Sequence, residues 1–265
     1  MPPRTAAVTH RGAVCRLLGW ATRTPTSLHR LLGHDDLVDF TELSGLHGDG
    51  WGLARAVAGG VEVRKRPDTA RASDDFALWS RATRSDLGLV HLRRATLGLR
   101  VRAENTHPFT DGRLAFAHNG SISPPPSLDV LLSPSAQGLR RGDTDSERYF
   151  LAVLTRLEAG ATPAEALRGA IAGIVATASY TSLNCLLMTP DELYAGCWFD
   201  PDGHQSDEAP DYYHLGFRRA DDAVVVASSG WGRDWQELAN GELLVVRRGS
   251  LEVTVESLRP ELVGA

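Results

Sequence analysis

Val14-Cys15-Arg16-Leu17-Leu18-Gly19-Trp20 is the stretch around which the rest of this sequence is organised. The apolar run continues to position 22, and such a run predicts a buried strand. A cysteine at the head of a buried strand is ordinarily a core residue, because free cysteine is among the most buried residue types. Cys15 is therefore a core residue or a nucleophile, and residues elsewhere in the chain must decide.

The composition is that of an ordinary globular protein. The chain has 265 residues, of which 42% are hydrophobic and 23% charged, and this length fits one large domain. No run approaches the ~18 apolar residues of a membrane helix. The formal net charge of -5 comes without a basic block. We therefore expect neither a membrane nor a nucleic acid as partner. Lys65 is the only lysine.

Cysteine usage and the N-terminus predict a cytoplasmic location. Cys15, Cys185 and Cys197 are an odd number of cysteines in a chain too long to need disulfide staples, so we expect reduced thiols. The first fourteen residues contain no apolar core of signal-peptide length. Neither feature favours secretion.

Alternating apolar runs separated by turn residues predict antiparallel hairpins. Segments 51–57 and 61–66 pair across Gly59-Gly60, and 89–93 and 114–118 are expected as buried strands. Three further hairpins are expected, 183–188 with 193–198, 213–218 with 223–228, and 243–246 with 251–255. Antiparallel pairing with few helices indicates an α+β fold.

Helices are predicted between these strands. A short one covers 26–32, and another begins after Ser73 and runs to about residue 84. The T-x-x-E patterns at Thr144 and Thr162 predict capping boxes that open two longer helices, to about residues 158 and 176. Two irregular segments are also expected, a glycine-dense turn over 48–52 and a proline-rich surface loop over 123–142.

Several polar residues lie at the ends of these elements. Asn119-Gly120 places an amide donor beside an unhindered backbone N–H, which suits a tetrahedral oxyanion, although Asn-Gly is also a common turn dipeptide. Arg93 is a fork for a carboxylate or a solvated strand-end residue. Asp145 holds an ammonium group or favours the positive end of its helix. Taken singly, each residue leaves both interpretations open.

The combination resembles the class II glutamine amidotransferases. The matching motifs occur in the family's order and approximate spacing from residue 15 to about 155, and more weakly to about 250. They are Cys15-Arg16-Leu17-Leu18-Gly19, His47-Gly48-Asp49-Gly50-Trp51-Gly52, His91-Leu92-Arg93-Arg94-Ala95-Thr96, Asn105-Thr106-His107-Pro108-Phe109, His118-Asn119-Gly120 and Thr144-Asp145-Ser146-Glu147. The chain is most similar to the stand-alone members, which lack a synthetase domain.

This resemblance implies roles for the candidate residues. Cys15 is the nucleophile, and once it is N-terminal its α-amine is the general base; Asn119 and Gly120 hold the oxyanion. Arg93 binds the α-carboxylate of a glutamyl group and Asp145 its α-ammonium.

Three further positions of the family line or support the pocket, namely Thr96, Gly50 and His107. For each of these, structural support and substrate contact are equally expected. Arg94 stands where the biosynthetic members commonly have tryptophan, which puts the leaving-group specificity in doubt.

The resemblance also implies the fold and the reaction. The fold is the N-terminal nucleophile hydrolase fold, a four-layer αββα sandwich of two antiparallel sheets. The reaction is hydrolysis of a γ-glutamyl amide, of glutamine or a conjugate, through a thioester on Cys15, with release of ammonia or an amine. An ammonia-accepting synthetase is a partner that the resemblance allows. No cofactor is expected, and no catalytic metal, because the histidines show no metal-ligand spacing.

Two alternatives to this reaction remain. One is the γ-glutamyl hydrolase of ergothioneine biosynthesis, in which the region matching Asn105-Thr106-His107-Pro108 differs, so that His107 favours the general amidotransferases. The other is a non-catalytic glutamine- or partner-binding protein, which applies if Cys15 is never N-terminal.

Residues 1–14 decide between catalysis and binding alone. We interpret them as an extension or propeptide ahead of a single domain over 15–265. Either maturation removes them or translation begins at Val14, since the only methionine after Met1 is Met188. A free α-amine on Cys15 titrates near ~7.7–8.0 and can accept the thiol proton, whereas a peptide nitrogen cannot.

Overall fold

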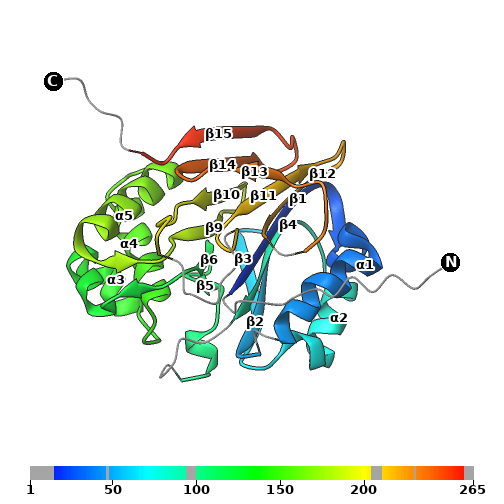
Figure 1. Ribbon diagram of the computed structural model, residues 1–265, viewed down its shortest axis with the longest axis horizontal. Helices are drawn as coiled ribbons and strands as arrows, with labels where there is room; N and C mark the ends of the chain where they lie inside the picture. The colour runs from blue at the N-terminus through cyan, green and yellow to red at the C-terminus, as the bar shows by residue number, and fades with distance from the viewer. Residues whose placement is uncertain (1–14, 46–47, 94–99, 204–210, 230, 260–265) are drawn as a thin grey trace.

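The protein has two stacked antiparallel sheets with helices on both outer faces. The computed structural model describes residues 15–45, 48–93, 100–203, 211–229 and 231–259. The predicted α+β class and the four-layer αββα arrangement are confirmed (Figure 1). The first sheet has seven strands in the order β13 (Gln236–Leu238), β11 (Leu215–Arg219), β12 (Ala223–Ser228), β1 (Arg16–Ser27), β4 (Arg84–Arg93), β2 (Gly50–Val57) and β3 (Gly60–Arg66).

The second sheet packs face to face on the first. It has six strands in the order β15 (Val253–Ser257), β14 (Glu242–Arg247), β10 (Glu192–Cys197), β9 (Asn184–Met188), β6 (Ala115–Asn119) and β5 (Phe109–Thr110). A two-stranded ribbon joins β7 (Ile122–Ser123) to β8 (Ser179–Tyr180). The four predicted hairpins, 51–57 with 61–66 and the three C-terminal pairs, are confirmed.

Three apolar layers hold the sandwich together. Leu17 and Leu89 of the first sheet pack against Leu186 of the second in the central layer. On the outer face of the first sheet the apolar layer includes Leu18 and residues of α1 (Leu28–Glu42) and α2 (Asp74–Ala82). The outer face of the second sheet is covered by α4 (Asp145–Glu158) and α5 (Pro163–Thr177).

Strand β1 lies inside the first sheet and is apolar on both faces. Leu17 and Ala21 belong to the central layer, whereas Leu18 and Trp20 belong to the outer one, as expected for side chains that alternate along a strand. Its partners are β12 and β4, so that Leu18 lies opposite both Ala227 and Val90. Burial on both faces explains why the sequence here is a continuous apolar run.

The prediction of a proline-rich surface loop over 123–142 is wrong. The 3-10 helix η4 (Pro125–Leu131) and α3 (Pro134–Leu139) occupy most of it. Both helices have proline in the first turn, a position where its missing N–H costs nothing, and Ser133 caps α3. Each also buries an apolar side chain, Leu128 or Ala136. Proline thus starts helices here instead of breaking them.

Three local predictions also need correction. The helix expected over 26–32 begins at Leu28 and continues to Glu42, bending at Gly33 where φ is 77°. Gly50 and Gly52 belong to β2 and not to a turn. Thr144 caps α4 through its hydroxyl, but the carboxylate of Glu147 accepts from the N–H groups of residues 141 and 142, so only half of the predicted box forms.

Shorter 3-10 helices complete the chain. They are η1 (Leu43–Gly45), η2 (Ala70–Ala72) and η3 (Ala103–Asn105). Among the helices of the described ranges, none is both long enough and apolar enough to cross a lipid bilayer.

The capping box of α5 provides a test of this local chemistry. Thr162 accepts from the backbone N–H of Glu165, whose carboxylate accepts from the Thr162 N–H at 2.8 Å. We expect Thr162→Ala to lower the free energy of unfolding by about 1 kcal/mol, measured by urea denaturation, and Thr162→Ser to retain most of it. Equal losses in the two variants would contradict the capping role.

Candidate active site

Cys15 lies immediately before β1, at one end of the space between the two sheets. It is 7% exposed. Leu17 and Ala21 of β1 face the second sheet, and alternation along the strand places Cys15 on the same face. In the antiparallel register Arg16 lies opposite Leu92, so the next pair outward is Cys15 and Arg93. Leu87 and Leu89 of β4 likewise face the second sheet, which gives Arg93 the same orientation.

Arg93 is a buried cation close to three anionic or ionisable groups. Its side chain is 2% exposed, and Nη1 donates to the Asp49 carbonyl at 3.2 Å. Burial lowers the pKa of Arg93, whereas the charges of Cys15, Asp49 and Asp145 raise it in part. Because an arginine stays protonated in proteins, its guanidinium is a fixed positive charge beside the cysteine.

Asn119 ends β6 and faces the first sheet. Ala115 and Ala117 of the same strand lie in the central layer, and alternation gives Asn119 the same direction. Its side chain is fully buried, yet neither Nδ2 nor Oδ1 has a hydrogen-bond partner in the described part of the chain. The cross-strand neighbour Asn184 differs, because its amide donates to the Tyr213 carbonyl and accepts from the Trp198 N–H.

Gly120 follows Asn119 in a conformation and a space that only glycine fits. Its φ is +151°, and a Cβ at this position would lie 2.0 Å from the carbonyl oxygen of Ser182. Because residue 120 has no side chain, these two segments can approach each other this closely.

Asp145 is the first residue of α4 and joins that helix to the segment after Gly120. Oδ2 accepts from the Ile122 N–H at 2.7 Å, and Oδ1 accepts from the Ser146 N–H at 2.8 Å. The predicted role at the positive end of a helix is therefore present. Its charge also acts on Arg93, which places the carboxylate near the buried guanidinium.

Three buried histidines lie between the sheets and behind β6. The rings of His107 and His91 are 4.0 Å apart between centroids, and burial holds the pKa of His107 well below its usual value. His91 Nε2 lies 3.3 Å from the His118 carbonyl. His118 contacts the Ser146 hydroxyl and the Ser182 carbonyl, each at 2.9 Å, and burial lowers its pKa.

These contacts lie next to the candidate residues Asn119 and Asp145 in the chain. Two of the contacting residues, Ser146 and Ser182, had no predicted role, although both lie in stretches that match the family. Their only sequence signal was the adjacent motif. His107 has no hydrogen-bond partner for either ring nitrogen in the described residues.

Of the remaining predicted residues, the structure describes Gly50 but not Thr96. Gly50 pairs with Arg93 across β2 and β4, and a Cβ on it would lie 2.9 Å from Thr106 Cγ2, so close packing explains the glycine. Thr96 lies outside the described residues, as do His47 and Arg94.

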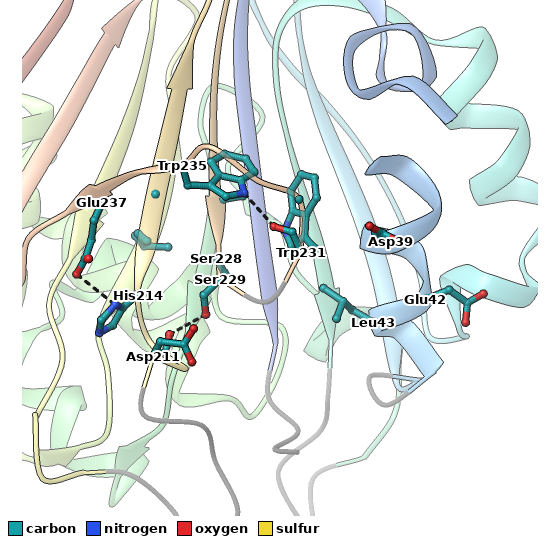
Figure 2. Close-up of a pocket in the computed structure, with 14 residues that line it drawn as sticks. Asp39, Glu42, Leu43, Asp211, His214, Ser228, Ser229, Trp231, Trp235 and Glu237 are labelled. Carbon is teal, nitrogen blue, oxygen red and sulfur yellow. Dashed lines mark hydrogen bonds and ion pairs between the residues drawn. The ribbon is translucent and has the colours of Figure 1, made fainter. Parts of the chain in front are cut away.

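A separate cavity of about 690 Å³ lies on the outer face of the first sheet, beside the end of α1 (Figure 2). Ala227, Leu43 and Trp231, which line it, belong to the outer apolar layer. Its walls carry several exposed carboxylates, and Glu237 pairs with His214 at 3.1 Å. None of the predicted site residues lines this cavity, although Ser228, which does, accepts from the Leu17 N–H two residues after Cys15.

Comparisons with known proteins identify the family of this chain. Residues 14–200 match the family described as glutamine amidotransferases class-II. The chain is 27% identical over 212 residues to the γ-glutamyl-hercynylcysteine sulfoxide hydrolase of Mycolicibacterium smegmatis, covering 79% of this chain and 82% of that protein. It is 27% identical over 165 residues to the probable glutamine amidotransferase DUG3 of Saccharomyces cerevisiae, covering 55% of this chain but only 46% of that protein.

The fold has a solved counterpart. A glutamine aminotransferase class-II domain protein from Silicibacter pomeroyi superposes with a TM-score of 0.66 at 23% identity, over 93% of this chain and 100% of that one. Because the family match extends over most of the chain and contains Cys15, Arg93, Asn119 and Asp145, this protein belongs to the class II glutamine amidotransferases.

Proposed function

We propose that this protein hydrolyses a γ-glutamyl amide through a thioester on Cys15. One observation carries the proposal: the fully buried amide of Asn119, without a partner in the described residues, faces the same space as Cys15 and Arg93. An unpaired buried amide costs about 1–3 kcal/mol, a cost that a bound substrate oxygen relieves.

The first half of the reaction breaks the amide bond. The α-amine of an N-terminal Cys15 accepts the thiol proton, and the thiolate attacks the γ-carbonyl carbon. The carbonyl electrons move to oxygen, where Asn119 Nδ2 and the Gly120 N–H donate to the oxyanion. As the oxyanion collapses, the C–N bond breaks and the leaving amine takes the proton held by the α-amine.

The second half releases glutamate. Water gives a proton to the α-amine and attacks the thioester, passing through a second oxyanion in the same two-donor site. The C–S bond then breaks, and the sulfur regains its proton. Arg93 binds the α-carboxylate and Asp145 the α-ammonium in both halves, which keeps the γ-carbonyl beside the sulfur.

A γ-glutamyl thioether or sulfoxide is a second candidate substrate. Relatives from mycobacteria that match 79% of this chain are named γ-glutamyl-hercynylcysteine sulfoxide hydrolases. Ammonia release from glutamine, measured beside cleavage of a γ-glutamyl thioether or sulfoxide, distinguishes the two reactions. A preference of kcat/KM for the bulky conjugate would select this second candidate, and the same Cys15 chemistry would apply.

Asn119 tests the oxyanion site. We expect Asn119→Ala to lower kcat by about 10²–10³, because one oxyanion donor contributes about 2.7–4 kcal/mol to transition-state stabilisation. Steady-state turnover of glutamine measures the change, with Asp39→Asn in the outer cavity as a control that should keep wild-type turnover. Near-normal turnover by Asn119→Ala would remove Asn119 from the mechanism.

Arg93 tests recognition of the α-carboxylate. Arg93→Lys keeps the charge but loses the bidentate fork, and a hydrogen bond to a charged group contributes about 1.5–3 kcal/mol. We therefore expect kcat/KM for glutamine to fall by about 10- to 150-fold. Glutamine with its α-carboxylate converted to an amide should lose this discrimination between wild type and variant. An equal loss with both substrates would argue against the carboxylate contact.

The N-terminus tests the base. We expect protein that begins at Cys15 to be active, and protein that retains Met1 and the following residues to be inactive, because only the former has an α-amine beside the sulfur. Intact mass spectrometry identifies each form, and ammonia release measures its activity. Full activity with Met1 retained would overturn the amine-as-base mechanism.

A further inference from the structure

Lys65, the only lysine of the chain, contacts the segment that carries His107. Its Nζ donates to the Thr106 carbonyl at 2.6 Å and to the Pro108 carbonyl at 3.1 Å. It also lies 5.3 Å from the centroid of the Phe109 ring. One ammonium group therefore holds the two carbonyls that flank His107, from a strand about forty residues earlier in the chain.

Segment 106–108 packs directly against the strand that supports Arg93. A Cβ on Gly52 would lie 2.0 Å from the His107 carbonyl oxygen, and one on Gly50 would lie 2.9 Å from Thr106 Cγ2. Gly50 pairs with Arg93 in the sheet. The carbonyl that accepts from the Arg93 guanidinium belongs to the residue just before Gly50. A displacement of 106–108 would thus reach the guanidinium through β2.

The same segment reaches Asn119 only indirectly. The His107 ring packs on His91 at 4.0 Å, and His91 Nε2 lies 3.3 Å from the carbonyl of His118, the residue before Asn119. Two ring contacts therefore separate Lys65 from the oxyanion site, whereas a backbone contact connects it to Arg93. Changes at Lys65 should affect glutamyl binding more than the chemical step.

Lys65 is ionised at neutral pH but close to losing its proton. Burial lowers its pKa to about 8, while Glu147 and Glu104 raise it in part. Glu147 accepts from two backbone N–H groups at 2.7 Å, and it acts on Lys65 through its charge, whereas the two carbonyls accept hydrogen bonds from the ammonium. Lys65 lines a cavity of about 500 Å³, whose other ionisable lining residues are Glu104, Asp111, Arg141 and Glu147. His107, which also faces Lys65, is neutral because burial depresses its pKa.

We propose that Lys65 is a positioning residue, whose ammonium holds segment 106–108 against β2 and so places Arg93 for the α-carboxylate of the substrate. The inference rests on the proposed γ-glutamyl hydrolysis. Loss of the ammonium leaves the carbonyls of Thr106 and Pro108 without their charged donor and frees the segment to shift. The expected signature is weaker substrate binding with nearly unchanged turnover at saturation.

Kinetics of two variants test this role in protein that begins at Cys15. Lys65→Met keeps most of the apolar stem but removes the donors, and should raise KM for glutamine about tenfold, which corresponds to about 1.4 kcal/mol, with kcat within about threefold of wild type. Lys65→Arg keeps a charged donor and should restore most of the binding. Arg64→Met removes the neighbouring, more exposed cation of β3 and should leave KM unchanged.

The pH profile separates positioning from a merely structural role. In wild type, KM should rise as the pH passes about 8, because the neutral amine is a weaker donor than the ammonium. In Lys65→Arg this rise should be absent, because arginine keeps its proton. The ionisation of glutamine itself affects both proteins equally, so the difference between their profiles reports on Lys65.

A spectroscopic measurement gives an independent readout. Protein labelled with [13Cε]lysine, expressed without lysine in any tag, should show one lysine resonance that titrates near 8. Titration near the ordinary value of about 10.4 would place the amine in water and overturn the inference. An unchanged KM in Lys65→Met, or equal losses that Lys65→Arg does not restore, would overturn it too. Absence of turnover in wild type would instead reject the proposed function and, with it, the site that Lys65 positions.

Discussion

Antiparallel pairing between β1 and β4 is the constraint on which the candidate site depends. It places Leu92 opposite Arg16 and therefore brings Arg93 to the same end of the sheet as Cys15. Side chains alternate along a strand, so a slip of one residue would turn either group away from the second sheet. The double apolar burial of β1 fixes this register, because Leu17 and Leu18 fill different layers. Core packing thus determines where the sulfur lies.

The parts of the fold that the sequence predicted are those whose signals are local. The hairpin over 51–57 and 61–66 follows from alternation and a Gly-Gly turn, and the helix after Thr162 follows from a capping box. The segment 123–142 was misjudged because its prolines lie in the first turns of helices, which only tertiary burial of Leu128 and Ala136 stabilises. Position 52 likewise requires glycine because the His107 carbonyl packs closely against it, and not because the chain turns there.

The residues of the candidate site also differ in whether the sequence carries a local signal for them. Cys15, Arg93, Asn119 and Asp145 were predictable because each belongs to a motif and ends or begins an element. Lys65 was recognised in the sequence only as a single lysine. Its contacts join β3 to a segment 41 residues later, and its register opposite Gly52 follows from the hairpin alone. Alternation with Val61 and Val63 places Lys65 on the inner face of the strand, but nothing local indicates which carbonyls its ammonium meets.

Two neighbouring buried asparagines differ in whether the fold satisfies their hydrogen bonds. Asn119 and Asn184 form a cross-strand pair and are both fully buried. Asn184 is satisfied on both sides of its amide by backbone groups and so contributes to stability. Asn119 has neither partner among the described residues. Natural proteins satisfy nearly all buried polar groups, so this unpaired amide lowers stability at one place. A rigid frame can bear this cost, and under the proposed function the amide is then preorganised to donate to the substrate oxyanion.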